Sequence, residues 1–415
     1  MAKKVWILNH HANNMYFANG GRHYCIAKYL KRKGYEPFIV CANAEHGTGK
    51  KCFDNEDLFS VHINTQIDVP FIFVKSRTYT NNGKDRIMGM FDYYFNVKKI
   101  AKEIVERYGK PDVIIGSSVH LLACLAGIKL SKKYGAKCIT EIRDLWPESI
   151  VAYGLATKKN VIIKILYKFE KYLYEHSDDI IFTMPGGKNY IIEQGWNREN
   201  GGKIDLARVH NINNGTDLEV FTYNREKYQL DDNDLNNNEI FKVVYTGSLR
   251  KANEIDLLVE TAKITKESTI KFLIWGRGDE EEYLKKLVQK YGLNNIIFKG
   301  SVEKKYIPYI ISKSNVNFLD AFDERVAKYG ISSNKLFEYF AAQKPILISE
   351  MDIYPMKGSG FLIPYKKEPN DIYKKIMEIF SMKDNCSDLC DSANEATKIY
   401  NYESLTEKMV EVIEG

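Results

Sequence analysis

Short apolar runs alternate with longer segments of helical periodicity in the first half of the chain. The apolar runs predict β-strands at 5–9, 37–41, 71–74, 112–116, 137–141 and 180–183. The periodic segments predict helices at 21–33, 91–108, 121–134 and 161–176. Strands that alternate with helices indicate βαβ units built around a parallel sheet.

The same alternation returns after residue 240. It predicts strands at 241–245, 270–275, 296–299, 316–319 and 345–349, and helices at 254–265, 280–291 and 335–342. The turn sequence at 213–216 predicts the crossing between two domains, and the polar stretch 230–239 predicts an exposed loop. We therefore expect an α/β protein of two doubly wound domains, with ligands at the carboxyl ends of the strands in a shared cleft.

The size and composition of the chain agree with this class. Its 415 residues favour two domains. No run of about 18 uncharged apolar residues occurs, and the N-terminus resembles a strand, so we expect neither a transmembrane helix nor a signal peptide. Seven scattered cysteines favour reduced cytoplasmic thiols over disulfides or zinc. The net charge of +6 is too small to indicate nucleic acid, but it permits an acidic ligand or an anionic membrane surface.

The segment 329–347 carries the clearest pattern for a ligand site. A loop with Gly330, Ser332, Ser333 and Asn334 leads into an apolar helix that has Lys335 and Glu338 on one face. Ser and Asn are preferred helix caps, and a helix N-terminus can hold a phosphate. Lys335 can add charge against a diphosphate, and Glu338 can accept hydrogen bonds from a ribose. An ordinary capped helix with two surface charges fits the same residues.

Turns that combine glycine with cations follow two predicted strands of the second half. Gly247, Arg250 and Lys251 follow the first of these strands, and Gly276 and Arg277 follow the second. Glycine lets the backbone approach a ligand closely, and the cations can neutralise a diphosphate. A solvated charged turn is the alternative interpretation of each.

Polar groups also follow the predicted strands of the first half. Gly20 and Gly21 open a helix, but without the Gly-x-Gly-x-x-Gly spacing, which argues against a simple NAD enzyme. His120 follows the strand 112–116, where it can bind a phosphate or sugar hydroxyl or act as a general base. The alternative interpretation of Gly20 and Gly21 is the ordinary start of a helix. The alternative for His120 is a purely structural role.

The segment 141–148 follows a further strand. Arg143 and Asp144 can bind an acceptor or stabilise charge, and Trp146 can stack on a sugar. A salt-bridged loop around a core tryptophan is the alternative.

Two other patterns need weighing. Asp232 and Asp234 have the spacing that can hold a divalent ion on a sugar nucleotide, but they lie in the polar loop, so we expect them to be solvated and predict no required metal or other cofactor. The segment 161–172 is basic and apolar by turns; it suits an amphipathic core helix first and an anionic membrane surface second.

Taken in order, these segments resemble the retaining glycosyltransferases of the GT-B fold, family 4, and especially the bacterial O-antigen and capsule branch that includes N-acetylfucosamine transferases. The resemblance implies two Rossmann-like domains that face a central cleft. The N-terminal acceptor domain would be 1–212, joined by a returning C-terminal helix at 396–415. The nucleotide-sugar domain would be 213–395.

The resemblance also implies roles for individual residues. It places Glu338 on the ribose, Lys251 and Arg250 on the diphosphate, and the 330–334 loop on the sugar and β-phosphate. Gly20 and Gly21 would approach the phosphates, and His120, Lys251 and Asp144 are the expected catalytic residues. The chain departs from the family where Gly330 replaces the first Glu of a Glu-x7-Glu pair and where Ser248 replaces a frequent Arg.

The implied reaction moves an N-acetylated hexose or deoxyhexose from a UDP-sugar to a polyprenyl-diphosphate-linked glycan, with retention. The protein would be cytoplasmic, or peripheral at the inner face of the cell membrane. Two alternatives stay open: an enzyme like UDP-N-acetylglucosamine 2-epimerase, and a non-catalytic subunit of a glycosyltransferase complex.

Overall fold

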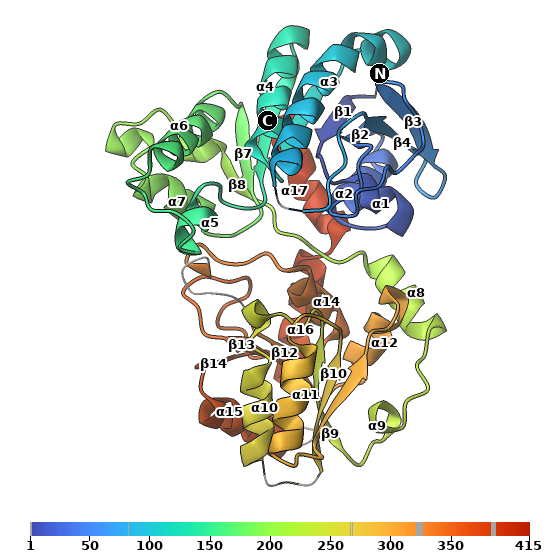
Figure 1. Ribbon diagram of the computed structural model, residues 1–415, viewed down its shortest axis with the longest axis vertical. Helices are drawn as coiled ribbons and strands as arrows, with labels where there is room; N and C mark the ends of the chain where they lie inside the picture. The colour runs from blue at the N-terminus through green and yellow to red at the C-terminus, as the bar shows by residue number, and fades with distance from the viewer. Residues whose placement is uncertain (1, 82, 266, 268, 321–326, 383–386) are drawn as a thin grey trace. The chain divides into compact units, whose positions relative to one another are not determined.

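The computed structural model describes residues 2–81, 83–265, 267, 269–320, 327–382 and 387–415. The chain forms two compact units (Figure 1). The N-terminal unit contains Met1–Asn213 and Tyr402–Gly415, and the C-terminal unit contains Asn214–Asn401. Each unit has a mainly parallel sheet covered by helices, so the prediction of an α/β chain with two Rossmann-like domains is confirmed.

The described part of the N-terminal unit holds a sheet of order β3-β4-β2-β1-β5-β6-β7-β8. Neighbouring strands are parallel except β3 and β4, which are antiparallel. The strands are β1 (Lys4–Leu8), β2 (Glu36–Ala42), β3 (Phe59–Asn64), β4 (Val69–Val74), β5 (Val113–Ser117), β6 (Lys137–Ile142), β7 (Asp179–Phe182) and β8 (Val209–Asn211). The helices are α1 (Asn13–Ala18), α2 (Arg22–Arg32), α3 (Lys84–Tyr108), α4 (Leu121–Tyr134), α5 (Glu148–Ala152), α6 (Val161–Glu175), α7 (Gly187–Glu193) and α17 (Tyr402–Glu414).

The described part of the C-terminal unit holds a parallel sheet of order β11-β10-β9-β12-β13-β14. The strands are β9 (Phe241–Thr246), β10 (Ile270–Trp275), β11 (Ile296–Gly300), β12 (Val316–Leu319), β13 (Ile346–Ser349) and β14 (Leu362–Tyr365). The helices are α8 (Leu218–Lys227), α9 (Asn233–Asn236), α10 (Asp256–Ile264), α11 (Glu281–Lys290), α12 (Ile307–Ser312), α14 (Asn334–Ala342), α15 (Pro369–Met382) and α16 (Ser387–Ile399).

The central strands are apolar throughout because both of their faces are buried. In β1, Val5 and Ile7 pack against α2 and α17, whereas Trp6 and Leu8 face α3 and α4 on the other side of the sheet. This alternation follows from the period of two in an extended strand. The predicted strands of both halves are all present. The strands that the pattern did not predict lie at the edges of the sheets, namely β3, β8 and β14.

The last helix completes the N-terminal unit. The chain leaves the C-terminal unit after α16, and α17 then packs on α2. Leu405, Met409 and Ile413 of α17 are buried in the same core cluster as Leu30 of α2. The helix predicted near the end of the chain is thus present and covers one face of the N-terminal sheet.

The polar stretch 230–239 is largely exposed, as its composition predicted, but it contains a short helix and a buried residue. Asp232 caps the short helix α9 by accepting a hydrogen bond of 2.9 Å from the Leu235 N–H, and Leu235 is fully buried. Asp232 and Asp234 are not simply solvated either, because the Lys299 ammonium lies 2.8 and 2.5 Å from their carboxylates. The structure of this segment depends on the buried side chain of Leu235 and on Lys299, which lies 65 residues after Asp234 in the chain.

Two further expectations concerned the cysteines and membrane-spanning helices. The cysteines at 25, 41, 52, 124 and 138 are free thiols, while Cys386 lies outside the described residues. Among the helices that the structure describes, none combines the length and apolar character needed to cross a bilayer.

Candidate functional site

The glycine turns that follow β9 and β10 lie against each other at the carboxyl ends of these two neighbouring strands. The Gly247 N–H donates to the Trp275 carbonyl at 2.9 Å, and the Leu249 N–H donates to the Arg277 carbonyl at 2.9 Å. A Cβ on Gly276 would lie 1.7 Å from the Gly247 carbonyl oxygen, and Gly276 has a φ of +152°. Glycine is therefore required there by the neighbouring backbone.

The cations of these turns lie near a cavity of about 690 Å³. Arg250 and Lys251 line it together with Glu254, Tyr283 and Lys367. Lys251 belongs to a short 3₁₀ helix, η3 (Lys251–Asn253), and its side chain is exposed. Arg277 is exposed as well. The structure thus places two of the three cations of these turns, Arg250 and Lys251, on one cavity wall.

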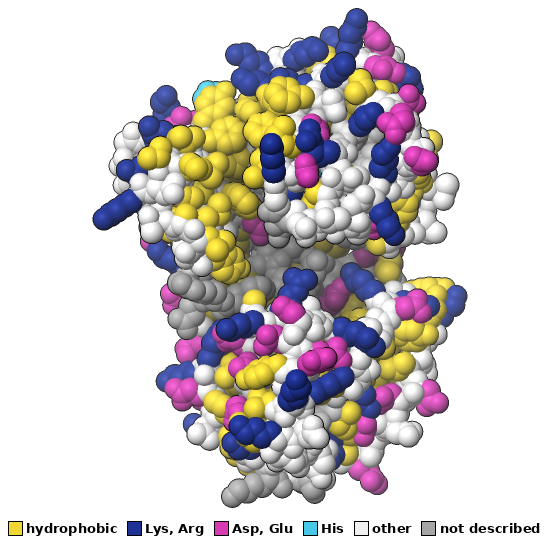
Figure 2. Space-filling model, viewed as in Figure 1, with side chains coloured by type: hydrophobic (Ala, Val, Ile, Leu, Met, Phe, Trp, Pro, Cys, Tyr) yellow, Lys and Arg dark blue, Asp and Glu magenta, His cyan; other side chains and the backbone are white. Residues whose placement is uncertain are grey.

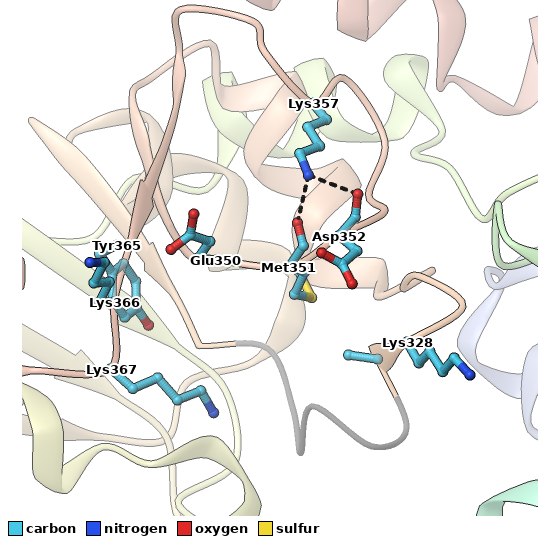
Figure 3. A pocket seen from close by; sticks show the side chains of 9 residues that line it. Lys328, Glu350, Met351, Asp352, Lys357, Tyr365, Lys366 and Lys367 are labelled. Atoms are coloured by element: carbon cyan, nitrogen blue, oxygen red, sulfur yellow. Dashed lines mark hydrogen bonds between the residues drawn. The ribbon is translucent and has the colours of Figure 1, made fainter.

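A second cavity of about 640 Å³ lies beside β14 (Figure 3). It is lined by several lysines and two carboxylates, and Lys367 lines both cavities. The Lys357 ammonium is engaged, because it donates to the carbonyls of Met351 at 3.0 Å and Asp352 at 2.8 Å. These residues carried no sequence signal beyond their charge, and none of them was predicted to bind a ligand.

Helix α14 begins at Asn334 with Ser333 in the cap position. The Ser333 side chain makes no capping hydrogen bond, so the predicted side-chain cap is absent and the hydroxyl does not occupy the first-turn N–H groups. Ser332 is turned toward the domain crossing, where its Oγ accepts from the Asn214 N–H at 2.8 Å and its carbonyl accepts from Asn214 Nδ2 at 2.6 Å. The helix therefore starts with donors available to an anion.

Gly330 has a φ of +84°. A glutamate at this position would have to adopt a left-handed conformation that side chains with a Cβ rarely accept. The departure from the family pattern at 330 is thus built into the backbone of the loop.

Lys335 lies directly beneath the Gly247 turn. Its Nζ donates to the Tyr245 hydroxyl at 3.2 Å and sits 4.7 Å from the centre of that ring. A Cβ on Gly247 would come within 2.9 Å of the Lys335 Nζ. Burial lowers the pKa of Lys335 to about 8, against the opposing effect of Asp320 and Glu338. Lys335 is consequently a mostly protonated group close to the glycine turn at neutral pH.

Glu338 lies one turn further along α14. Its carboxylate is 3.4 Å from the Lys304 ammonium, and 21% of its side chain is exposed. The carboxylate can therefore still accept hydrogen bonds from a ligand.

Asp320 is a candidate that the sequence patterns missed. It follows β12, its side chain is fully buried, and the Lys367 ammonium lies 3.4 Å from its carboxylate. Burial raises the pKa of Asp320 to about 7, opposed by Lys367. The signal that could have revealed it is an aspartate placed directly after the apolar strand 316–319.

In the N-terminal unit, Gly21 precedes α2 with a φ of +102°, whereas a Cβ on Gly20 would meet nothing closer than 3.7 Å. The next side chain, Arg22, points into the protein and donates to Glu141 from Nε at 2.9 Å and Nη2 at 2.7 Å. His23 contacts the other Glu141 oxygen at 2.9 Å. Burial alone would raise the pKa of Glu141, but Arg22 and His23 outweigh it and hold that pKa well below its usual range.

The other predicted residues of this unit lie at the carboxyl ends of β5 and β6. His120 caps α4 and is buried, with its Nε2 2.8 Å from the His10 Nδ1. Arg143 is half-buried, and its backbone N–H donates to the Ser118 Oγ at 2.9 Å. Asp144 is exposed and Trp146 half-buried, so Trp146 is not a core residue.

Comparison with known proteins relates the C-terminal unit to a family. Residues 228–398 match the family model "Glycosyl transferases group 1". The putative colanic acid biosynthesis glycosyl transferase WcaI of Escherichia coli K12 is 26% identical over 211 residues, which cover 49% of this chain and 49% of that protein. The match therefore spans about half the length of this curated relative.

Solved structures share the architecture over nearly the whole chain. Sucrose-phosphate synthase from Thermosynechococcus elongatus has a TM-score of 0.69 at 16% identity, covering 99% of this chain and 98% of that one. Anabaena HepE in complex with UDP has a TM-score of 0.66 at 13% identity, with 100% of both chains covered. A putative UDP-N-acetylglucosamine 2-epimerase from Listeria monocytogenes has a TM-score of 0.56 at 12% identity, covering 100% and 96%. The fold is that of the GT-B glycosyltransferases, and these likenesses establish the fold alone.

Proposed function

We propose that this protein is a retaining glycosyltransferase that moves a sugar from a UDP-sugar to a hydroxyl of a lipid-linked glycan in cell-surface polysaccharide synthesis. The observation that carries the proposal is the grouping of the Gly247 turn, the half-buried Lys335 ammonium and the α14 helix within the segment that matches the glycosyltransferase family. The colanic acid relative and the UDP complex of HepE support the choice of reaction and donor.

The donor diphosphate is the group that this region suits best. Backbone N–H groups at the start of α14 and the Lys335 ammonium act on the phosphates, and Arg250 and Lys251 add charge from the cavity wall. Glu338 accepts hydrogen bonds from the ribose. Fixed donors aimed at a leaving group stabilise the charge that develops as the bond to it breaks.

The chemical step is front-face displacement at the anomeric carbon. The bond between that carbon and the diphosphate oxygen breaks, and a bond to the acceptor oxygen forms on the same face. The acceptor proton passes to the departing diphosphate. UDP leaves with the bonding electron pair, so the step needs no cofactor and no covalent enzyme intermediate.

The first test is calorimetry of UDP, GDP, ADP and NAD on the wild type and on Glu338→Gln. We expect UDP-selective binding that weakens about tenfold in the variant, because a charge-assisted hydrogen bond to the ribose is lost. Glu282→Gln, an exposed residue of α11, is the matched control. Binding of NAD alone, or equal UDP affinity in Glu338→Gln, would contradict the donor assignment.

Incubation of a UDP-sugar without acceptor separates the alternatives. Epimerisation would identify an epimerase, and UDP binding without any turnover on added glycan would identify a non-catalytic subunit.

Contact with an anionic membrane is part of the proposal, and the surface of α6 supports it. Val161, Ile162 and Ile165 are 70%, 67% and 59% exposed, and Lys164 and Lys168 lie on the same helix. Hydrophobic side chains gather on this part of the N-terminal unit in Figure 2. Apolar residues with interspersed lysines suit a helix in a lipid interface. An ordinary core helix would bury these side chains.

Sedimentation with vesicles containing anionic lipid tests this contact. We expect binding that falls at high salt and is lost in an Ile162→Asp, Ile165→Asp double variant. Val220→Asp, an exposed apolar position on α8, is the control. Equal sedimentation of the double variant and the wild type would refute the role of α6.

A further inference from the structure

Four imidazoles form a continuous cluster in the N-terminal unit, which we call the histidine cluster: His10, His11, His46 and His120. The ring centres of His46 and His11 are 4.6 Å apart, those of His11 and His10 are 4.7 Å apart, and those of His10 and His120 are 4.9 Å apart. His10 and His11 follow β1, His46 follows β2, and His120 follows β5. The cluster thus lies at the carboxyl ends of adjacent parallel strands.

The histidines of the cluster become progressively more buried from His46 to His10 and His120. His46 is exposed and His11 half-buried, whereas His10 and His120 are 1% and 4% exposed. A ligand can therefore approach from the His46 side and still meet buried polar groups.

Several ring nitrogens of the cluster are buried and have no hydrogen-bond partner among the residues that the structure describes. They are Nε2 of His10, Nδ1 of His120 and both nitrogens of His11. Leaving a buried polar group unpaired typically costs about 1–3 kcal/mol. Such groups in a native protein call for an explanation, and a bound group that supplies the missing partners is a common one.

The charges around the cluster select the kind of group. The positive charge of Arg86, on α3, lowers the pKa of all four histidines, and that of Arg143 lowers the pKa of His11. The Tyr79 hydroxyl contacts His46, and the Tyr93 ring packs on His10. The carboxylates nearby in sequence are placed differently: Glu45 accepts from Thr48, and Asp144 is exposed.

Burial and these cations keep the imidazoles neutral. Burial first, then the other histidines of the cluster, and then Arg86 lower the pKa of His11 to about 2 and that of His120 to about 3, and hold the pKa of His10 well below its usual range. An anion among the rings would reverse the second effect and raise these pKa values. Neutral sugar hydroxyls would leave the cationic surroundings uncompensated.

We propose that the histidine cluster, with Arg86 and Arg143, binds the diphosphate of the acceptor. This deepens the proposed function, on which the choice of acceptor rests. The C-terminal unit has its own cations and helix N-terminus for the donor phosphates, so a second phosphate-binding group in the N-terminal unit is left for the other substrate. Binding is accompanied by proton uptake, and the affinity for the anion therefore rises as the pH falls.

Calorimetry of inorganic pyrophosphate on the full chain, with UDP saturating, tests the proposal at pH 6 and pH 8. We expect affinity at least tenfold higher at pH 6, with proton uptake measured from buffers of different ionisation enthalpy. His11→Gln should lose most of this pH dependence and bind at least fivefold more weakly at pH 6. His46→Gln repeats the test at an exposed ring, where we expect the substitution to disturb the fold least. His176→Gln, an exposed histidine at the end of α6, is the control and should bind as the wild type does.

Farnesyl diphosphate, compared with pyrophosphate, identifies the source of the anion. Tighter binding of the prenylated probe that depends on His11 supports a lipid-linked acceptor, whereas equal binding of the two probes overturns that assignment. Pyrophosphate affinity that is independent of pH, or unchanged in both His11→Gln and His46→Gln, overturns the site. These readouts need no turnover, so they stand apart from a failure of the proposed sugar transfer.

Discussion

The two units stabilise equivalent turns in opposite ways. In the N-terminal unit, the start of α2 is tied to β6 by buried side chains, since Arg22 and His23 both bind Glu141 and Ser117 donates to the same carboxylate at 2.8 Å. In the C-terminal unit, the turns after β9 and β10 are held by backbone packed on backbone. One arrangement depends on charge and the other on the absence of side chains.

The difference predicts different sensitivities. The pKa of Glu141 is depressed in the folded protein, so its contribution to stability is present above the ordinary carboxyl pKa and is lost as the pH falls. The glycine turns are held to each other by backbone contacts and not by a buried ion pair, so we expect no such dependence of their packing on pH.

The largest effect should come from breaking the ion pair. Arg22→Met leaves the Glu141 carboxylate buried without its main partner, and we expect a loss of about 3–5 kcal/mol in the free energy of unfolding. Urea denaturation followed by hydrogen exchange should locate the loss in the N-terminal unit. A loss below about 1 kcal/mol would mean that His23 alone compensates the charge.

A somewhat smaller loss should come from the glycine turn. Gly276→Ala forces a Cβ against the Gly247 carbonyl, and we expect about 2–4 kcal/mol of destabilisation confined to the C-terminal unit. Gly135→Ala is the control, because Gly135 also has a positive φ of +72° but open space around it, and it should cost only about 1 kcal/mol. Equal losses in the two variants would remove the backbone contact from the explanation.

The smallest effect concerns Lys335, the cation of α14 that lies against the glycine turn. The pKa of Lys335 is lowered to about 8, so UDP affinity should fall as the pH rises through 8 and the ammonium loses its charge. Lys335→Met should bind UDP about tenfold more weakly at pH 7 and abolish this slope, since a charge-assisted hydrogen bond is worth about 1.5–3 kcal/mol. Calorimetry from pH 6.5 to 9 measures both. Lys290→Met on α11 should leave the profile of the wild type, and a slope retained in Lys335→Met would assign it to another group.

The sequence was a good guide where one periodicity dominated. The strands of both sheets follow continuous apolar runs, and α14 was predicted to within one residue of its observed start. Failures occurred where long-range contacts decide the outcome. Leu235 lies in a polar sequence yet is buried, and Asp232 and Asp234 meet a lysine from β11.

The sequence indicated which residues belong to the candidate site, but not which other residues they contact. Lys335 was expected to face a ligand, but nothing in its local sequence shows that it lies under Gly247 and against Tyr245. His10 and His120 are 110 residues apart in the chain, and only the order of the strands brings them together. Asp320 has no motif around it beyond the strand that it follows.

The position of α17 has a consequence for biosynthesis. This helix covers part of the N-terminal core, but a ribosome makes it only after the whole of the C-terminal unit. Until then, the apolar face of α2 that receives Leu405 and Met409 stays open in the nascent chain. The C-terminal unit is synthesised without interruption, so it can finish folding first, and the N-terminal unit closes last although it is translated first.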